Sequence, residues 1–158
     1  YSIVQSFEYV LVMILAQLPG YVAAAWLVEK LGRKATLAGF IGMCAVSAYF
    51  FGQANSVNLI MFWGCLMSFF NLGAWGVLYT YTPEQYPTNI RAFGSGWASA
   101  IGRMGGIVAP MVVTHMMIME NGFSQVFMMF TAVLFGVALV ILILGEETKG
   151  KTLESIGL

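Results

Sequence analysis

One arginine interrupts a long run of small and apolar residues. Arg103 stands in "WASAIGRMGGIVAP", residues 97–110, and Ser99 lies four positions before it, on the same side of a helix. A guanidinium stays charged at every physiological pH, so it is unsuited to carrying a proton. Its planar fork of N–H donors suits a carboxylate held through two hydrogen bonds. The residue chemistry therefore favours a carboxylate partner for Arg103; alternatively, Arg103 has a structural role and donates to backbone carbonyls or to a carboxylate elsewhere in the protein.

A second group of candidate binding residues combines polar and aromatic side chains. Asn71, Trp75 and Tyr79 recur every four residues, so a helix would place them on one face. Aromatic faces there would hold an aromatic ring; alternatively, these residues anchor a span at the membrane surface. Gln17 precedes Pro19, where we expect a kink whose freed backbone groups the amide satisfies. Contact between Gln17 and a substrate is left open.

The sequence lacks the residue patterns of covalent, acid–base and metal chemistry. It holds no acid–base pair, no nucleophile beside a base and no metal-type cluster at usable spacing. Cys44 and Cys65 lie in apolar blocks and are interpreted as core thiols. His115, a lone histidine, is interpreted as structural and not as a proton relay. We therefore expect no enzyme, no metal site and no cofactor.

The apolar residues that must position these groups form five long blocks. Only 9% of the 158 residues are charged and 59% are hydrophobic, against about 25% charged in a soluble domain. Each block is long enough to cross a bilayer. It should do so as a helix, because unpaired backbone cannot face lipid. The expected fold class is all-α, a polytopic membrane helix bundle. Its predicted spans are residues 7–28, 35–53, 59–81, 93–119 and 124–145.

These bounds place Arg103 deep inside a span. It follows Phe93 by ten residues, or about 15 Å at the helical rise of about 1.5 Å per residue. That is the midplane of a hydrocarbon core about 30 Å thick. A charge at that depth should face protein or a water-filled cavity and have a partner.

The basic residues predict an orientation. They fall in the first and third breaks between spans and in the tail, and the second and fourth breaks contain none: Lys30, Arg33, Lys34, Arg91, Lys149 and Lys151. The positive-inside rule then places the N-terminus of the chain outside and the C-terminus in the cytoplasm, in a plasma or inner membrane. An odd number of spans entered from outside implies at least one earlier span. No basic patch points to nucleic acid.

The three charged segments resemble motifs of the major facilitator superfamily. "EKLGRK", residues 29–34, resembles its short cytoplasmic motif, and "PEQYPTNIR", residues 83–91, resembles the segment between helices ten and eleven. "EETKGKTLESI" is similar to the tail after helix twelve, with Glu146 where proline is usual. The resemblance implies that residues 1–158 are a partial C-terminal transmembrane domain, helices eight to twelve of twelve, with a cytoplasmic tail 146–158.

The resemblance also implies a substrate. In organic-anion members an arginine follows the loop arginine by twelve positions, as Arg103 follows Arg91, within a context similar to "GRMGGIVAP". The pattern is similar to that of bacterial nicotinate transporters. It implies secondary active transport of a small organic anion, such as nicotinate, by alternating access. The alternatives are a sugar or organic-cation transporter in which Arg103 is structural, and a non-transporting receptor or scaffold.

Charged side chains near the breaks suggest a gate. The glycine of the first break allows a tight turn, and nearby charges can pair with a helix terminus. The predicted gating residues are Glu29, Gly32, Arg33, Lys34, Glu84, Arg91, Glu146 and Glu147. They would hold this half against the missing N-terminal half; alternatively they are solvated loop charges worth roughly 0–1 kcal/mol per pair. The expected partners are that half, the lipid bilayer and a small-molecule substrate.

Local signals around the third break give three further expectations. Pro83 and Pro87 should break the chain after the third span. Thr88 or Asn89 should cap the helix that follows. Tyr81, beside the break, is interpreted as an anchor at the membrane surface.

Overall fold

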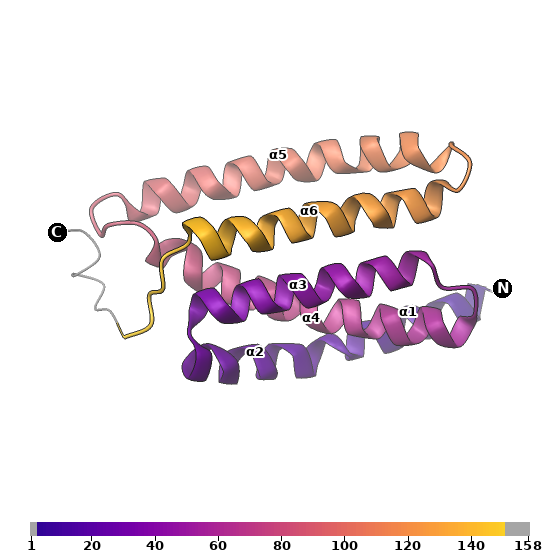
Figure 1. Cartoon of the computed structure of the whole chain (residues 1–158), viewed down its shortest axis with the longest axis horizontal. Coiled ribbons are helices and arrows are strands. Elements are labelled where there is room, and N and C mark those ends of the chain that lie inside the picture. The colour runs from indigo at the N-terminus through magenta and orange to yellow at the C-terminus, as the bar shows by residue number, and fades with distance from the viewer. Residues whose placement is uncertain (1–2, 151–158) are drawn as a thin grey trace.

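The computed structural model describes residues 3–150, and over these residues the chain folds into six α-helices (Figure 1). They are α1 Ile3–Leu15, α2 Gln17–Leu31, α3 Arg33–Gly52, α4 Val57–Glu84, α5 Arg91–Met117 and α6 Gly122–Leu144. Within that range five segments are long and apolar enough to cross a membrane, and the first combines α1 with α2. The all-α class and the five spans are therefore confirmed. All five helical segments begin before the predicted apolar blocks; the first and third also end later, whereas the other three end slightly earlier.

The first span is interrupted where a kink was expected. The helical pattern breaks at Ala16, whose N–H still donates to the carbonyl of Val12 at 3.0 Å, and resumes at Gln17. Pro19 has no N–H to bond Leu15, so the break falls where the helix loses a hydrogen bond. The side chain of Gln17 makes no hydrogen bond with the described residues, so its expected role in satisfying the kink is not observed.

Pro83 does not break the chain as expected, because it lies inside the last turn of α4. Near a helix end, proline removes a single hydrogen bond, and the backbone goes on to form two turn-type hydrogen bonds. The N–H groups of Gln85 and Tyr86 donate to the carbonyls of Thr82 and Pro83, each at 3.3 Å.

The expected cap of α5 is also wrong. The N-cap position of α5 is occupied by Ile90, with no side-chain hydrogen bond. Arg91 instead turns back over the loop, and its Nε donates to the carbonyl of Pro83 at 3.0 Å while its Nη2 donates to Thr88 Oγ1 at 3.4 Å. The hydroxyl of Thr88 is therefore engaged by a side chain and not by the start of the helix.

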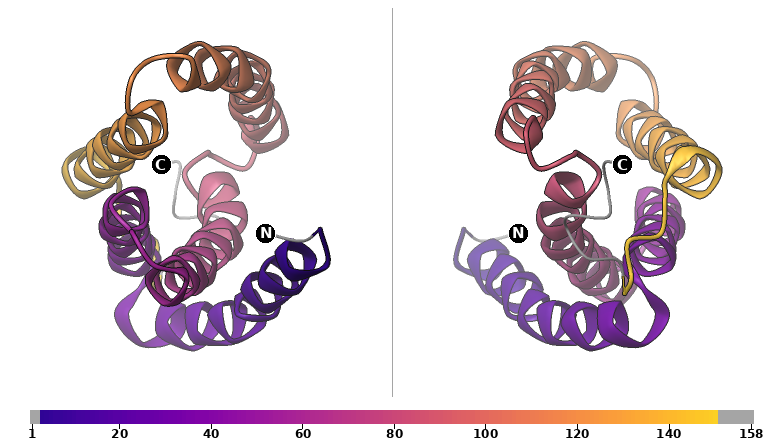
Figure 2. Two further views of the ribbon diagram at one scale, coloured as in Figure 1. Left: turned by 90° about the vertical axis from the view of Figure 1, so that its right-hand side faces the viewer. Right: turned by 90° about the vertical axis from the view of Figure 1, so that its left-hand side faces the viewer.

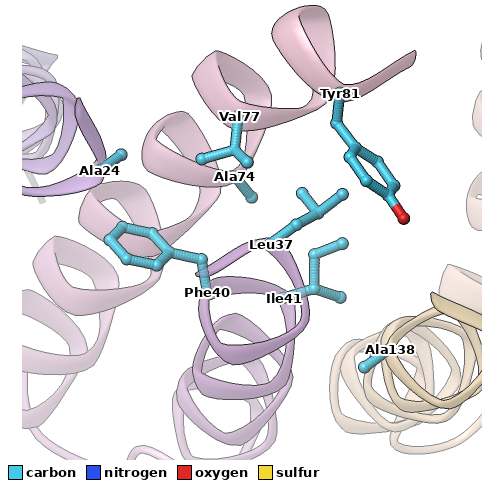
Figure 3. Close-up of a cluster of buried hydrophobic side chains, with 8 residues drawn as sticks. All are labelled: Ala24, Leu37, Phe40, Ile41, Ala74, Val77, Tyr81 and Ala138. Atoms are coloured by element: carbon cyan, nitrogen blue, oxygen red, sulfur yellow. The ribbon is translucent and has the colours of Figure 1, made fainter. Parts of the chain in front are cut away.

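The core lies where α3 is enclosed by its neighbours. Helix α3 packs against α4 and α6, and α2 packs against α4. Eight buried side chains from these four helices meet there (Figure 3): Ala24, Leu37, Phe40, Ile41, Ala74, Val77, Tyr81 and Ala138. Small residues dominate the α2–α4 contact. Lipid is as apolar as the helix surfaces, so burying them gains no hydrophobic free energy, and the helices associate through van der Waals contact at close backbone approach.

Two glycines set that close approach. A Cβ at Gly20 would collide with the carbonyl of Phe69, and one at Gly73 would collide with the ring of Phe40 and lie 3.1 Å from the carbonyl oxygen of Gly20. The crossing of α2 and α4 therefore depends on the absence of these two side chains.

Helix α5 is poorly enclosed by its neighbours. It contacts α6 and α4, yet none of its residues is buried. The end-on views show α5 leaning away on one side of the bundle and α1 on another (Figure 2). Its side chains are consequently presented away from the core.

Candidate functional site

Arg103 lies in the middle of α5. It follows the first residue of the helix by twelve positions and precedes the last by fourteen, so it is about 18 Å from the Arg91 end. Its side chain is exposed, and it makes no hydrogen bond or ion pair with any residue that the structure describes. The partner expected for it is therefore not among these residues. An unpaired guanidinium at this depth costs at least about 2.5–3.5 kcal/mol, which a bound anion would offset.

The residues next to Arg103 on α5 have small side chains, and the space beside them is open. Ser99, one turn earlier, is exposed. A Cβ added to Gly102, Gly105 or Gly106 would find no atom within 4 Å. Space therefore surrounds this stretch of α5 in the described part of the chain.

The candidate residues of α4 share one exposed face, as their spacing predicted. Asn71, Trp75 and Tyr79 are exposed, and the two rings are 46% and 68% accessible. The ring centroids of Trp75 and Tyr79 lie 5.5 Å apart with an angle of 35° between the planes. No hydrogen bond or ring contact within residues 3–150 joins this pair to Arg103. The structure thus brings the two rings together but does not bring them into contact with the arginine.

The remaining candidate, Gln17, is half-buried at the break between α1 and α2. Both cysteines are free thiols, Cys44 buried and Cys65 half-buried. Over the described residues, no three histidine, cysteine, aspartate or glutamate side chains gather as metal ligands would.

The three charged segments meet at one end of the bundle (Figure 1), where the segment after α6, residues 145–149, crosses the α2–α3 turn. Glu147 accepts hydrogen bonds from the backbone N–H of Arg33 at 2.9 Å and of Lys34 at 3.2 Å. These N–H groups open α3, where the helix dipole favours a negative charge. Glu147 therefore caps α3 from a distant part of the chain. The charges around Gly32 were expected to pair with a neighbouring helix terminus, whereas here the charge comes from Glu147 and the terminus is the start of α3 itself.

Gly32 makes this cap possible. Its φ of +96° is a conformation that side chains with a Cβ rarely adopt. A Cβ at this position would also lie 2.5 Å from Oε2 of Glu147. The predicted tight turn at Gly32 is confirmed, and glycine is required there for both reasons.

The segment after α6 also forms hydrogen bonds with the end of α4 and with the α2–α3 turn. Glu84 Oε2 lies 3.4 Å from Nε of Arg33 and accepts a hydrogen bond from the hydroxyl of Thr148. The ammonium of Lys149 donates to the carbonyl of Lys30 at 2.6 Å. A charge network thus joins three segments of this one bundle.

Three predicted gating residues lie beside this network. Glu29 is exposed at the end of α2 and makes no hydrogen bond with the described residues. Arg91 contacts its own loop, as described above. Glu146 contributes its backbone carbonyl, which accepts from Tyr81 Oη at 2.7 Å and from Gln85 Nε2 at 3.2 Å.

Tyr81 and Thr148 are the structural residues that sequence reasoning missed. Tyr81 is buried in the core, so its interpretation as a surface anchor is wrong. It follows Val77 by four positions and Ala74 by seven, a helical repeat that marks the buried face and was the available signal. Nothing in the local sequence of Thr148 points to Glu84.

Five membrane-length helices, three charged segments joined at one end and an arginine midway along a span define a polytopic integral membrane protein. The sequence profile of the Major Facilitator Superfamily matches residues 4–157. The chain therefore belongs to this superfamily, as the resemblance of its charged segments implied.

Three relatives bear on the substrate. The niacin transporter NiaP of Acinetobacter baylyi is 82% identical over all 158 residues of this chain, which covers 36% of that relative. A Bacillus subtilis protein named for niacin and nicotinamide transport is 57% identical over 155 residues, 98% of this chain and 38% of the relative. Organic cation/carnitine transporter 7 of Arabidopsis thaliana is 30% identical over 145 residues, 87% of this chain and 27% of the relative. The chain thus spans little more than a third of the first two.

Proposed function

We propose that this chain is part of a transporter of nicotinate and that Arg103 binds the carboxylate of the substrate. The observation that carries the proposal is the exposed guanidinium midway along α5, which has no partner among residues 3–150, in a chain 82% identical to a niacin transporter. Arginine suits the task because its fork of donors matches both carboxylate oxygens. Transport, and not catalysis, is the proposed activity.

The pyridine ring is proposed to rest against Trp75 and Tyr79. Two exposed rings on one face of α4, 5.5 Å apart, offer an apolar surface that accepts a flat aromatic ring. Asn71, Ser99 and Gln17 are the proposed polar contacts around this site.

We assign the five spans to helices eight to twelve of a twelve-helix transporter that works by alternating access around a site near the midplane. The charged end of the bundle is proposed to be cytoplasmic, because it gathers the basic residues. There Glu147, Arg33 and Glu84 would keep this half rigid while it moves against the other half. Glu29, Lys34, Arg91 and Glu146 are the proposed contacts to that other half.

An organic cation is the second candidate substrate. It is favoured by the 30% identity to a transporter named for organic cations and carnitine. A cation beside Arg103 would meet an unpaired like charge in a low-dielectric site, where repulsion is strong. Competition between substrates of different charge separates the two candidates.

The test is uptake of labelled nicotinate by the full-length protein, with surface expression measured for each variant. Arg103→Ala should lower kcat/KM by roughly 10- to 100-fold, because a hydrogen bond to a charged group is worth about 1.5–3 kcal/mol. Arg103→Lys keeps the positive charge but lacks the fork of N–H donors, so its kcat/KM should lie between those of the wild type and Arg103→Ala. Met104→Ala, an equally exposed neighbour on α5, is the matched control and should transport normally.

Competitors define the sign of the substrate. Benzoate should inhibit uptake more strongly than a ring compound of similar size that carries a positive charge. Normal uptake by a well-expressed Arg103→Ala variant would refute the carboxylate role and leave the arginine structural.

A further inference from the structure

A small cavity lies between α2 and α4, and neither Arg103 nor the Trp75–Tyr79 pair is among the residues that line it. Its volume is about 140 Å³. It is lined by Tyr21, Ala24 and Ala25 from α2 and by Gly76, Val77 and Thr80 from α4. Two of these lining residues, Ala24 and Val77, are buried and belong to the core cluster (Figure 3). None of the sequence-predicted site residues lines this cavity.

Tyr21 forms one wall, and a glycine allows it to do so. A Cβ at Gly76 would lie 2.8 Å from Cε1 and 3.2 Å from Cδ1 of the Tyr21 ring. The ring therefore rests directly against the backbone of α4. It is still 45% exposed, so it is accessible to a ligand.

The volume of the cavity limits the size of the ligand that it can hold. An enclosed apolar cavity of about 150 Å³ accommodates one benzene molecule. This cavity has a similar volume but is open on one side, so a single six-membered aromatic ring can enter it. The hydroxyl of Thr80 donates to the carbonyl of Gly76 at 3.3 Å, which leaves its oxygen free to accept. The phenol of Tyr21 makes no hydrogen bond with the described residues and is available to a ring nitrogen.

The cavity carries no charge. Its lining contains no acidic or basic side chain, so it has no means of distinguishing a carboxylate from a neutral amide. Thr80 precedes the end of α4 at Glu84 by four residues, about 6 Å. Arg103 lies about 18 Å from the Arg91 end of α5. The cavity is therefore nearer to the charged end of the bundle than the arginine is.

We propose that this cavity is a second binding station, which holds the ring of nicotinate or nicotinamide irrespective of its charge on the loop-facing side of Arg103. The inference rests on the proposed function, since it takes the same class of substrate. A ring compound on its way to or from Arg103 would bind transiently in this cavity.

Thiol labelling tests the station without relying on transport. In the full-length protein, Thr80→Cys is treated with a small maleimide, and the modification is measured on the peptide that contains position 80. Saturating nicotinate and nicotinamide should each slow labelling at least fivefold, whereas acetate, a carboxylate without a ring, should not. Ala25→Cys gives the same readout from α2. Thr114→Cys is the matched control, an exposed threonine that likewise bonds the carbonyl four residues back.

The arginine variant separates the station from the main site. Protection of position 80 by nicotinamide should persist in an Arg103→Ala background. Ala25→Leu, which fills the cavity, should abolish protection at position 80. Equal labelling with and without ring compounds, loss of protection in Arg103→Ala, or full protection in Ala25→Leu would each overturn the inference.

Failure of the proposed function gives a different pattern. If wild-type protein takes up no nicotinate and no ring compound protects position 80, both proposals fall together. If uptake depends on Arg103 while position 80 is never protected, the station alone is wrong.

Discussion

Replacing Glu147 with alanine should release the first turn of α3. The carboxylate accepts from the backbone N–H groups of Arg33 at 2.9 Å, Lys34 at 3.2 Å and Lys149 at 3.0 Å. The first two N–H groups have no partner within α3, because a helix leaves its first N–H groups unsatisfied. Alanine would remove the carboxylate that accepts all three hydrogen bonds, and with it the negative charge at the positive end of the helix dipole.

The magnitude follows from these contacts. A hydrogen bond to a charged group contributes about 1.5–3 kcal/mol, and a charge at a helix terminus about 0.3–1 kcal/mol. Glu147 is half-buried, and water partly replaces the lost bonds, so the net loss should be about 2–3 kcal/mol. That corresponds to about 30- to 150-fold in the equilibrium between closed and open forms of this turn.

Amide hydrogen exchange measures this opening directly in the full-length protein. Exchange of the backbone N–H groups of residues 33–36 should accelerate about 30- to 150-fold in Glu147→Ala. Glu147→Gln keeps one acceptor oxygen, so its exchange rate should lie between those of the wild type and Glu147→Ala. Glu29→Ala is the matched control, since it removes an exposed carboxylate of the same turn that bonds none of the described residues. Acceleration below about threefold in Glu147→Ala, or equal acceleration in Glu29→Ala, would refute the cap.

Two stability predictions concern packing and are checked by thermal unfolding of the purified full-length protein. Tyr81→Phe should lower stability by about 0.5–1.5 kcal/mol, because it keeps the buried ring and removes only the bond to the carbonyl of Glu146; an unchanged midpoint would count against that bond. Gly20→Ala should cost about 1–3 kcal/mol through the collision with Phe69, whereas Gly39→Ala, with no atom within 4 Å of its added Cβ, should be neutral or stabilising. Equal effects of the two glycine variants would mean that the helix crossing is not tight.

The spans were predictable because their signal is local. Twenty consecutive apolar residues must form a helix in lipid whatever surrounds them, and the charge of Arg103 is conspicuous in such a run. The turn at Gly32 was likewise predictable from the residue type. The bounds were less so, since backbone hydrogen bonding continues past the last apolar residue and includes Pro83.

The contacts of Glu147 were not predictable in detail. Its partners lie 113 and 114 positions earlier and are backbone N–H groups, which every non-proline residue carries. No side-chain pattern marks them. Tyr81 was misread for a related reason, because its position beside a break suggests water while its helical phase places it in the core. Where Trp75 and Tyr79 lie relative to Arg103 depends on helix tilt, which spacing along the chain does not encode.

The cap on α3 also has a consequence for biogenesis. Arg33 is synthesised 114 residues before Glu147, and ribosomes add roughly 5–20 residues per second. The start of α3 therefore remains without its acceptor for roughly 6–23 s while the later spans insert. A chain cut short after α6 would keep every span and still lack the carboxylate that closes this end. The contact between Glu147 and the start of α3 therefore forms only after α6 has been synthesised.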